Sequence, residues 1–470
     1  MRKSLLWITI LISSISMVAV FSLAGCKAEE AASAEEVVQE ETAAEETTTT
    51  ETTENLAESR KAYSGTTLHV LLKEGYEIDV IQKYVGDFEK ATGINVVIEV
   101  YDEPTTRQKY ILDATSKTGA YDITATSFWY FPEYQKNGWL ESIEPFIANN
   151  ADAEWWKEED IPESALEVFS ADGQRYAMPH TIISGLTDFR KDILDKHGLP
   201  YPQTTDDILE LLPKLKELEP GMIGITSRGA PNFASLGTYL GWAWGYGAQL
   251  LDENFRPHAN SPEMVEALTD YVGLVRNYGP VDAPSLGFIA AGEKMQSGNA
   301  IIMCDTTGWG TILEDPAEST VNGKIGYVIL TGPADQPLQW IYMEGLGISS
   351  ASKNKEAAWL FLQWRMSRET TMKELTELAR TDTPNLYVLN SPEYQKFAEE
   401  RNITEYTKIL PEAWKIADIR YWPFIPEFIE IGDTFMVEIS AALAGQQDVP
   451  TALDKAQAAI DKILKEAGYY

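Results

Sequence analysis

Aromatic side chains that could stack on a flat ligand gather in several short stretches of this sequence. One stretch, residues 127–139, reads SFWYFPEYQKNGW. Other clusters contain Tyr239, Trp242, Trp244, Tyr246, Trp309, Trp340, Tyr342, Tyr421 and Trp422. Sugars present flat C–H faces to aromatic rings, and their hydroxyl groups need polar partners such as Asp, Glu, Arg and Asn. The clusters together therefore predict carbohydrate binding, although any single ring is more often a core residue.

Signatures of catalysis are scarce by comparison. The sequence has no HExxH, GxSxG, P-loop or GxGxxG motif, and its four histidines are too scattered to indicate a metal site. We therefore expect no catalytic residue, no metal and no cofactor. A glycoside hydrolase needs only two suitably spaced carboxylates, and 72 acidic residues leave that alternative open.

The charge balance limits the class of partner. Lysine and arginine number 38 against 72 aspartate and glutamate, which gives a formal net charge of −34. Such a chain repels nucleic-acid phosphates and anionic lipid surfaces, so we expect a neutral or cationic small molecule and no nucleic acid. With 470 residues, of which 44% are hydrophobic, the chain is long enough for two core-bearing units.

The first 26 residues have the order of an export signal. Arg2 and Lys3 precede an apolar run from Leu5 to Leu23, and small residues then lead to Cys26. A transmembrane anchor is the alternative, because the run is nearly long enough to span a bilayer. The ending LAGC resembles a bacterial lipobox. This resemblance implies a signal peptide at residues 1–25, a lipid on Cys26, and an extracytoplasmic protein held in the periplasm or at the outer face of the cell membrane.

The segment after Cys26 has the composition of a disordered tether. Residues 27–60 contain eleven glutamates and almost no large apolar side chains, so we assign residues 26–61 to the tether. If Cys26 carries lipid, Cys304 is the only other cysteine and cannot form a disulfide within the chain. It follows an apolar run, so we expect Cys304 to be a small buried side chain.

From residue 66 onward, strand and helix patterns alternate. Strands are predicted at 66–72, 94–101, 121–127, 323–330 and 344–350, and helices at 77–93, 105–119, 261–279, 353–367 and 451–468. This order predicts an α/β fold whose mostly parallel sheet is covered by helices on both faces. Ligands in such folds bind beyond the carboxyl ends of the strands, where Glu74 and Trp129 occur.

The order of the segments resembles the extracellular solute-binding proteins of bacterial ABC importers, the maltose- and sugar-type family 1. The stretches YDITATSFWYFPEYQKNGWLESIEPF, FIAAGEKMQSGNAIIMCDTTGWG and GLGISSASKNKEAAWLFLQW carry this resemblance, which covers nearly all of residues 66–460. It implies a two-lobed type II periplasmic-binding-protein fold. The chain would cross between lobes near AMPHTII, between Gly332 and Tyr342, and near Thr381. The lobes are then residues 62–180 with 340–380, and 181–339 with 381–470.

The resemblance also implies ligand contacts. In the family, ligand contacts come from the loops after the first strand and after YDITATS, and from the first crossover. They also come from the loop SRGAPN, the segment Thr307–Trp309 and two later loops. The cluster TYLGWAWGYG adds one tryptophan. The expected ligand-binding residues are Glu74, Trp129, Tyr130, His180, Arg228, Asn232, Trp242, Trp309, Glu344 and Arg380. The polar members are equally well explained as surface charges or as salt bridges between lobes.

These residues favour an uncharged ligand. Two glutamates and two arginines among them give a balanced charge, and no unpaired basic cluster suited to a phosphate or a uronate is found. We expect a monomeric receptor that delivers a sugar or polyol to ABC permease subunits and meets the membrane only through its lipid. A secreted carbohydrate-active enzyme, a binding protein for another small polar solute, and an adhesin or signalling receptor of the same fold are the alternatives.

Overall fold

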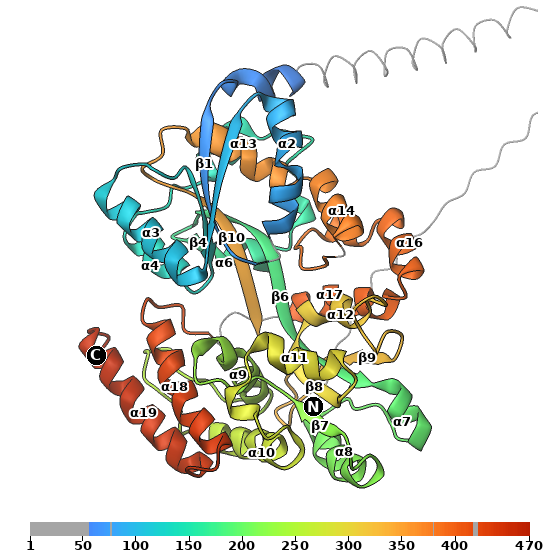
Figure 1. Ribbon diagram of the computed structural model, residues 1–470. Coiled ribbons are helices and arrows are strands. Elements are labelled where there is room, and N and C mark those ends of the chain that lie inside the picture. Colours follow the sequence, from blue (N-terminus) through green and yellow to red (C-terminus); the bar gives the residue numbers. More distant parts are fainter. Residues whose placement is uncertain (1–55, 76–77, 379, 417–421) are drawn as a thin grey trace, which may run out of the picture. The chain divides into compact units, whose positions relative to one another are not determined.

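The computed structural model describes residues 56–75, 78–378, 380–416 and 422–470, and Arg60–Tyr470 form one compact unit (Figure 1). The predicted signal peptide, Cys26 and most of the predicted tether lie outside these residues. Within the described ranges, no helix is both long and apolar enough to cross a bilayer.

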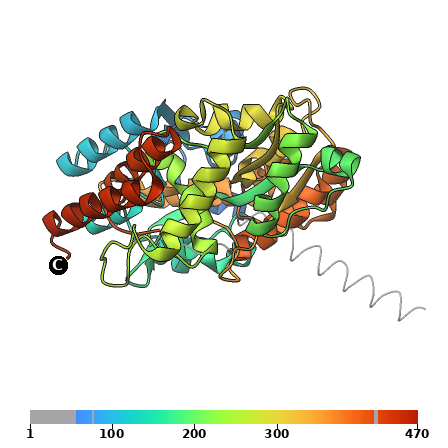
Figure 2. The same ribbon diagram turned by 90° about the horizontal axis from the view of Figure 1, so that it is seen from below.

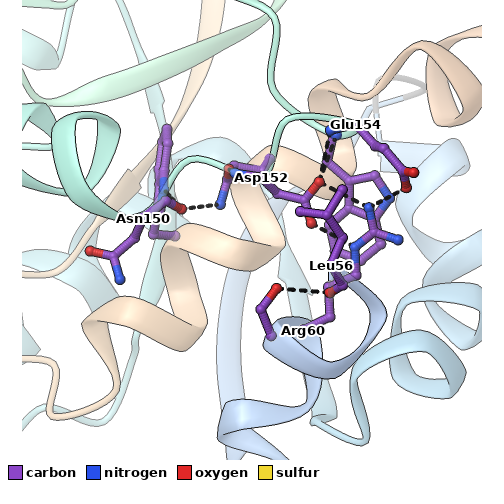
Figure 3. Close-up of polar contacts among 9 residues, drawn as sticks. Leu56, Arg60, Asn150, Asp152 and Glu154 are labelled. Atoms are coloured by element: carbon purple, nitrogen blue, oxygen red, sulfur yellow. Dashed lines mark hydrogen bonds and ion pairs between the residues drawn. The ribbon is translucent and has the colours of Figure 1, made fainter. Parts of the chain in front are cut away.

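The compact unit begins slightly earlier than the sequence suggested. Residues 56–60 are helical and lead into η1 (Lys61–Tyr63). Figure 3 shows the Arg60 guanidinium directed at two carboxylates: Nε lies 2.6 Å from Asp152 and Nη2 lies 2.7 Å from Glu154. The guanidinium carbon also lies 4.1 Å from the centre of the Trp155 ring. We therefore place the start of the compact unit at Arg60 rather than at residue 62.

This anchor should contribute a pH-dependent share of the stability. Burial raises the pKa of Asp152, but hydrogen bonds and charge from Arg60 outweigh it, so the net pKa is lowered. The stabilisation is thus present above the unfolded pKa of about 3.9 and is lost as the pH falls through the lower folded value. We expect Arg60→Ala to lower the free energy of unfolding by about 1.5–3 kcal/mol at pH 7.

Urea denaturation of both proteins from pH 7 to pH 2 checks this expectation. The difference between the parent and Arg60→Ala should shrink below about pH 4. A difference that stays constant over this range would instead assign the effect to packing of Arg60 on Trp155.

One wing of the sheet is parallel, as predicted. Strand β1 (Thr67–Lys73) pairs in parallel with β2 (Asn95–Tyr101) and β3 (Ile123–Ser127), and α2 (Asp79–Thr92) and α3 (Glu103–Ser116) connect the three strands. Gly93 ends α2 with φ of 72°, a conformation that glycine adopts without strain. The predicted strand at 94–101 is β2, an edge strand whose residues are exposed or half-buried, although its nearly continuous apolar run is typical of a buried strand.

Two long antiparallel strands form the centre of the sheet. All fourteen residues of β6 (Ala177–Arg190) are buried. Its first part pairs with β10 (Ile341–Ile348) up to Ser184, and from Gly185 onward it pairs with β8 (Ala300–Thr306). The strand order β2-β1-β3-β10-β6-β8-β7 thus joins two wings through β6 and β10, which run between the two groups of elements in Figure 1.

The second wing completes a mixed sheet. Strand β7 (Ile223–Thr226) is parallel to β8, and β9 (Ile325–Val328) pairs antiparallel with β6. The α/β class is therefore confirmed, with parallel pairs in the wings and antiparallel pairs in the centre. The strands β4 (Ser170–Ala171) and β5 (Gln174–Arg175) form a separate hairpin.

Helices cover both wings. On the first wing are α4 (Phe131–Lys136), α5 (Glu144–Asn150), η3 (Glu158–Asp160), α6 (Glu163–Val168), α13 (Lys355–Met366), α14 (Arg368–Glu377), α15 (Leu386–Leu389) and α16 (Pro392–Glu400). Every residue of α13 from Ala357 to Met366 is buried, so this helix is covered on all sides. Helices α15 and α16 pack on α14, although the predicted lobe boundary assigned them to the other lobe.

The second wing carries the remaining helices. They are α7 (Lys191–His197), α8 (Thr205–Leu218), η4 (Phe233–Ser235), α9 (Leu236–Gly245), α10 (Pro262–Tyr278), η5 (Ala283–Ser285), α11 (Phe288–Gln296), η6 (Thr307–Trp309), α12 (Gly310–Leu313), α17 (Thr404–Ile416), α18 (Phe428–Leu443) and α19 (Val449–Glu466). Ser261 caps the predicted helix α10, since its hydroxyl accepts from the Met264 amide at 3.2 Å. Helices α18 and α19 lie side by side in both views (Figure 2).

Candidate functional site

A cavity of about 270 Å³ lies at the carboxyl ends of β1 and β3, as the rule for parallel strands predicts. Residues from both wings and from β6 and β10 line it. They are Lys73, Glu74, Gly75, Glu103, Trp129, Thr181, Ile183, Arg228, Phe233, Ala234, Gly237, Phe288, Thr306, Trp340, Tyr342 and Trp422. This wall combines aromatic faces with a few charged groups, which is the usual composition of a small-molecule site.

Trp129 is the aromatic residue that the first wing contributes to the wall. It comes two residues after β3 and is half-buried. Its ring centre lies 4.7 Å from that of Tyr342 and 5.0 Å from that of Phe233, which meets it edge-on. The indole Nε1 donates to Glu103 at 3.2 Å. Ring packing and this hydrogen bond together fix the orientation of the indole.

Trp340 is seated in a slot made by three glycines. Gly237 and Gly241 lie one helical turn apart on α9, and Gly185 lies on β6 where that strand changes partners. A Cβ atom added to Gly237, Gly241 or Gly185 would lie 2.7, 2.9 or 3.0 Å from an atom of the Trp340 ring. The small residues at these positions therefore let the indole enter and hold it against the cavity.

Arg228 is held rigidly at the end of β7. Its Nε and Nη2 donate to the Asp305 carboxylate at 2.9 and 2.5 Å, and its Nη1 donates to the Ala234 carbonyl at 2.8 Å. The guanidinium carbon lies 4.6 Å from the centre of the Phe288 ring and 5.4 Å from that of Trp340. Each terminal nitrogen keeps a second N–H. Arg228 thus presents a fixed donor fork to the cavity.

Lys73 is the other cation of the wall, and it is also paired. Its Nζ lies 3.2 Å from Glu344 Oε1, and the Glu344 side chain is 1% exposed. The same ammonium lies 5.6 Å from the centre of the Tyr342 ring. Each cation of the cavity wall therefore has a buried carboxylate partner, and neither is left to balance an anionic ligand.

Three of the predicted ligand-binding residues line the cavity: Glu74, Trp129 and Arg228. Tyr130 and Glu344 lie one layer behind, around a smaller cavity that also touches Lys73. Burial, followed by the charge of Glu103, raises the pKa of Tyr130, so this phenol remains a neutral donor.

The other predicted residues lie away from the cavity lining. His180 is fully buried, and burial, with the charges of Arg365 and Lys73, lowers its pKa well below 6.5, so it is neutral at pH 7. Asn232 is exposed beside the wall residue Phe233. Arg380 lies 3.9 Å from Asp79 at a partly exposed position.

Two predicted tryptophans occupy cores instead of the cavity. Trp242 is 1% exposed and stacks on Tyr271 with ring centres 4.7 Å apart. Trp309 is 2% exposed and packs behind the wall residue Phe288, 4.9 Å between ring centres. Cys304 is buried as predicted, and burial raises the pKa of its thiol to about 12.

Several residues of the cavity wall were not among the predicted ligand-binding residues. Trp340, Tyr342 and Trp422 belong to the aromatic clusters noted there, but no local signal separated them from core rings. Lys73 directly precedes the predicted Glu74. Glu103 follows β2 and opens α3, and its place in the wall depends on the tertiary approach of Trp129. In the described part of the chain, no group of three or more His, Cys, Asp or Glu side chains is arranged to hold a metal ion.

Residues 74–372 match the family described as "Bacterial extracellular solute-binding protein". The mannitol-binding protein of Pseudomonas aeruginosa is 27% identical over 385 residues, which are 79% of this chain and 86% of the relative. A solute-binding protein of an ABC transporter from Agrobacterium vitis, solved with bound D-mannitol, is 27% identical with a TM-score of 0.74; the match covers 86% of this chain and 99% of that one. A similar protein from Agrobacterium radiobacter, in complex with ribitol, is 25% identical with a TM-score of 0.75, over 85% and 99% of the two chains.

Proposed function

Because this chain belongs to the bacterial extracellular solute-binding protein family, we propose that it is the receptor of an ABC importer for a sugar or polyol. The solute binds in the cavity described above and is passed to the membrane permease. The observation that carries this proposal is the cavity wall itself, where the faces of Trp129 and Trp340 accompany the fixed donor fork of Arg228. Membership of a family of binding proteins favours capture over turnover.

The pairing of the wall cations supports an uncharged solute. The Asp305 carboxylate neutralises Arg228, and Glu344 neutralises Lys73. The two remaining N–H groups on the Arg228 terminal nitrogens suit adjacent hydroxyl oxygens of a polyol. The relatives that were named or solved with mannitol and ribitol support acyclic polyols as the first candidates.

We propose further that the two wings belong to two lobes that close around the solute. Strand β6 changes partners between Ser184 and Gly185, so a bend there would move one wing against the other. The first lobe would comprise residues 60–184 with 341–400, since α15 and α16 pack on α14, and the second lobe the rest. The edge-on contact of Trp129 with Phe233 would then lie between the lobes.

The proposed placement of the protein combines the family with the sequence of its first residues. The family is extracellular. We propose that residues 1–25 are removed as a signal peptide and that a lipid on Cys26 tethers the chain to the membrane; these residues lie outside the described ones.

Titration calorimetry with a panel of sugars and polyols tests the proposal. The chain from residue 27 onward should bind at least one neutral member with one-to-one stoichiometry. The substrate class would be wrong if every neutral carbohydrate were silent while an amino acid, a peptide or a metal ion bound tightly. Turnover of an oligosaccharide would favour an enzyme.

Trp129→Ala should weaken binding far more than folding. We expect the Kd of the best neutral ligand to rise roughly 10- to 100-fold, about 1.4–2.8 kcal/mol, because a stacking face is lost from the wall. Trp139→Ala is the matched control, since Trp139 is also half-buried but packs on Tyr134, with ring centres 5.8 Å apart, and does not line the cavity. Equal losses of affinity in the two variants would contradict a contact between Trp129 and the ligand.

A further inference from the structure

Glu103 occupies a position in the cavity wall that the preceding proposal leaves without a role. It is the first residue of α3 and is half-buried. Its Oε1 accepts two hydrogen bonds, one from Trp129 Nε1 at 3.2 Å and one from the Tyr130 hydroxyl at 2.5 Å. Both donors use the same oxygen, so Oε2 takes no part in holding the rings. The side chain lines the large cavity and also the smaller one behind Tyr130.

The charges around the cavity are unequal once the paired groups are included. The wall itself contains two cations, Lys73 and Arg228, and two carboxylates, Glu74 and Glu103. Both cations are already matched by carboxylates behind the wall, Glu344 and Asp305. The carboxylates of Glu74 and Glu103 are therefore in excess, and they disfavour a second negative charge inside the cavity.

Glu74 and Glu103 differ in their exposure to solvent, and therefore in how strongly their charges act on a solute in the cavity. Glu74 is exposed, so water and salt screen its charge. Glu103 is partly withdrawn from solvent and touches the ring that we expect to lie against the solute. Water and salt therefore screen the negative charge of Glu103 less, and this charge acts on a solute that lies against the Trp129 ring.

We infer that Glu103 is the residue that restricts this cavity to solutes without negative charge, while it also positions the indole of Trp129. The inference rests on the proposed function, because it concerns the solute that binds in the same cavity. The class excluded is the sugar acids, in which a carboxylate replaces a terminal hydroxymethyl group. Uncharged polyols and their terminal amines are accepted.

Three ligands with the same carbon skeleton separate charge from shape. They are D-mannitol, D-mannonate and 1-amino-1-deoxy-D-mannitol, with the D-glucitol series as a second set; calorimetry uses the chain from residue 27 onward. With the parent protein, the acid should bind at least tenfold more weakly than the polyol, and the amine at least as tightly as the polyol. Binding of the acid within threefold of the polyol would overturn the inference, whereas silence of every neutral sugar and polyol would overturn the proposed function.

Two substitutions then separate the two roles of Glu103. Glu103→Gln keeps an amide oxygen that can accept from Trp129 and Tyr130 but removes the charge, so it should retain polyol affinity within about threefold and improve acid binding at least tenfold. Glu103→Ala should weaken polyol binding, because it also removes the acceptor that positions Trp129 and Tyr130. Glu144→Gln is the control, since Glu144 also is the half-buried first residue of a helix, pairs with Arg175 at 2.5 Å and lines neither cavity; it should leave the ratio of acid to polyol affinity unchanged. An unchanged ratio in Glu103→Gln would assign the selectivity elsewhere.

A spectroscopic readout tests the positioning role without any ligand. In protein labelled with ¹⁵N at the tryptophan indoles, the resonance that disappears in Trp129→Phe identifies the Nε1–H of Trp129. This resonance should shift strongly in Glu103→Ala and much less in Glu103→Gln, because only the alanine removes the acceptor. A resonance that is unmoved in Glu103→Ala would show that Glu103 does not hold the ring.

Discussion

Trp309→Ala is expected to lower the free energy of unfolding by about 3–5 kcal/mol, the range for removing a fully buried large aromatic side chain. Trp309 is 2% exposed and belongs to a small core with Met295, Ala300, Met303, Leu313, Val321 and Ile325. A Cβ atom added to Gly292 would lie 1.9 Å from this indole, so α11 passes directly against the ring.

Urea denaturation followed by circular dichroism measures this loss. Trp309→Phe is the conservative control. Its free energy of unfolding should fall considerably less than that of Trp309→Ala, because phenylalanine leaves a smaller cavity. Binding should be affected mainly through Phe288, which separates Trp309 from the cavity. A loss of stability below 1 kcal/mol together with a tenfold loss of affinity would mean that Trp309 faces the ligand, as the sequence had suggested.

The contrast between Trp129 and Trp309 shows how far sequence patterns can locate a site. Both residues follow a strand in the structure, but Trp129 was assigned to the cavity because it follows a predicted strand, and Trp309 because its segment resembles the family. Trp129 reaches the wall because β3 ends beside β1 and β10. Trp309 turns behind Phe288, a residue 21 positions earlier in the sequence that enters the wall from α11. Whether Phe288 or Trp309 lines the cavity depends on how α11 packs against the second wing. Local sequence patterns do not contain this information.

Elements with strong periodicity could be predicted closely. The sequence placed the first strand at 66–72 and the structure has β1 at Thr67–Lys73; the final helix was expected at 451–468 and α19 covers Val449–Glu466. The antiparallel centre was not predicted, because β6 was recognised only as a crossover. Its pairing with β10 joins residues more than 150 positions apart, and such long-range register is not encoded in the strand's own residues.

Only part of the cavity wall could be predicted, because contacts between distant segments also determine which residues line it. Glu74, Trp129 and Arg228 could be predicted because they follow strands or match family loops. Trp340 could be assigned to the wall only once Gly237 and Gly241 on α9 were known to leave space for its ring. Glu103 could be assigned only once the rings of Trp129 and Tyr130 were known to contact it. Residues whose role depends on contacts between segments are the ones that the sequence alone does not reveal.

Arg228→Ala should abolish polyol binding and lower the free energy of unfolding by about 3–5 kcal/mol, because it leaves the Asp305 carboxylate buried without its partner. The Asp305 side chain is fully buried, and two nitrogens of Arg228 bind it. Arg228→Lys should recover little of the binding, since an ammonium cannot reproduce the fork that serves Asp305, Ala234 and the ligand together.

The double variant Arg228→Met with Asp305→Leu separates the two losses. Removing both charges eliminates the unpaired carboxylate and fills the space with apolar atoms, so most of the stability measured by urea denaturation should return. Calorimetric binding should remain lost, because the donors toward the cavity are still absent. If binding returned along with stability, Arg228 would act only by supporting the fold. If neither returned, the pair would be required for packing around Phe288 and Trp340, which flank the guanidinium.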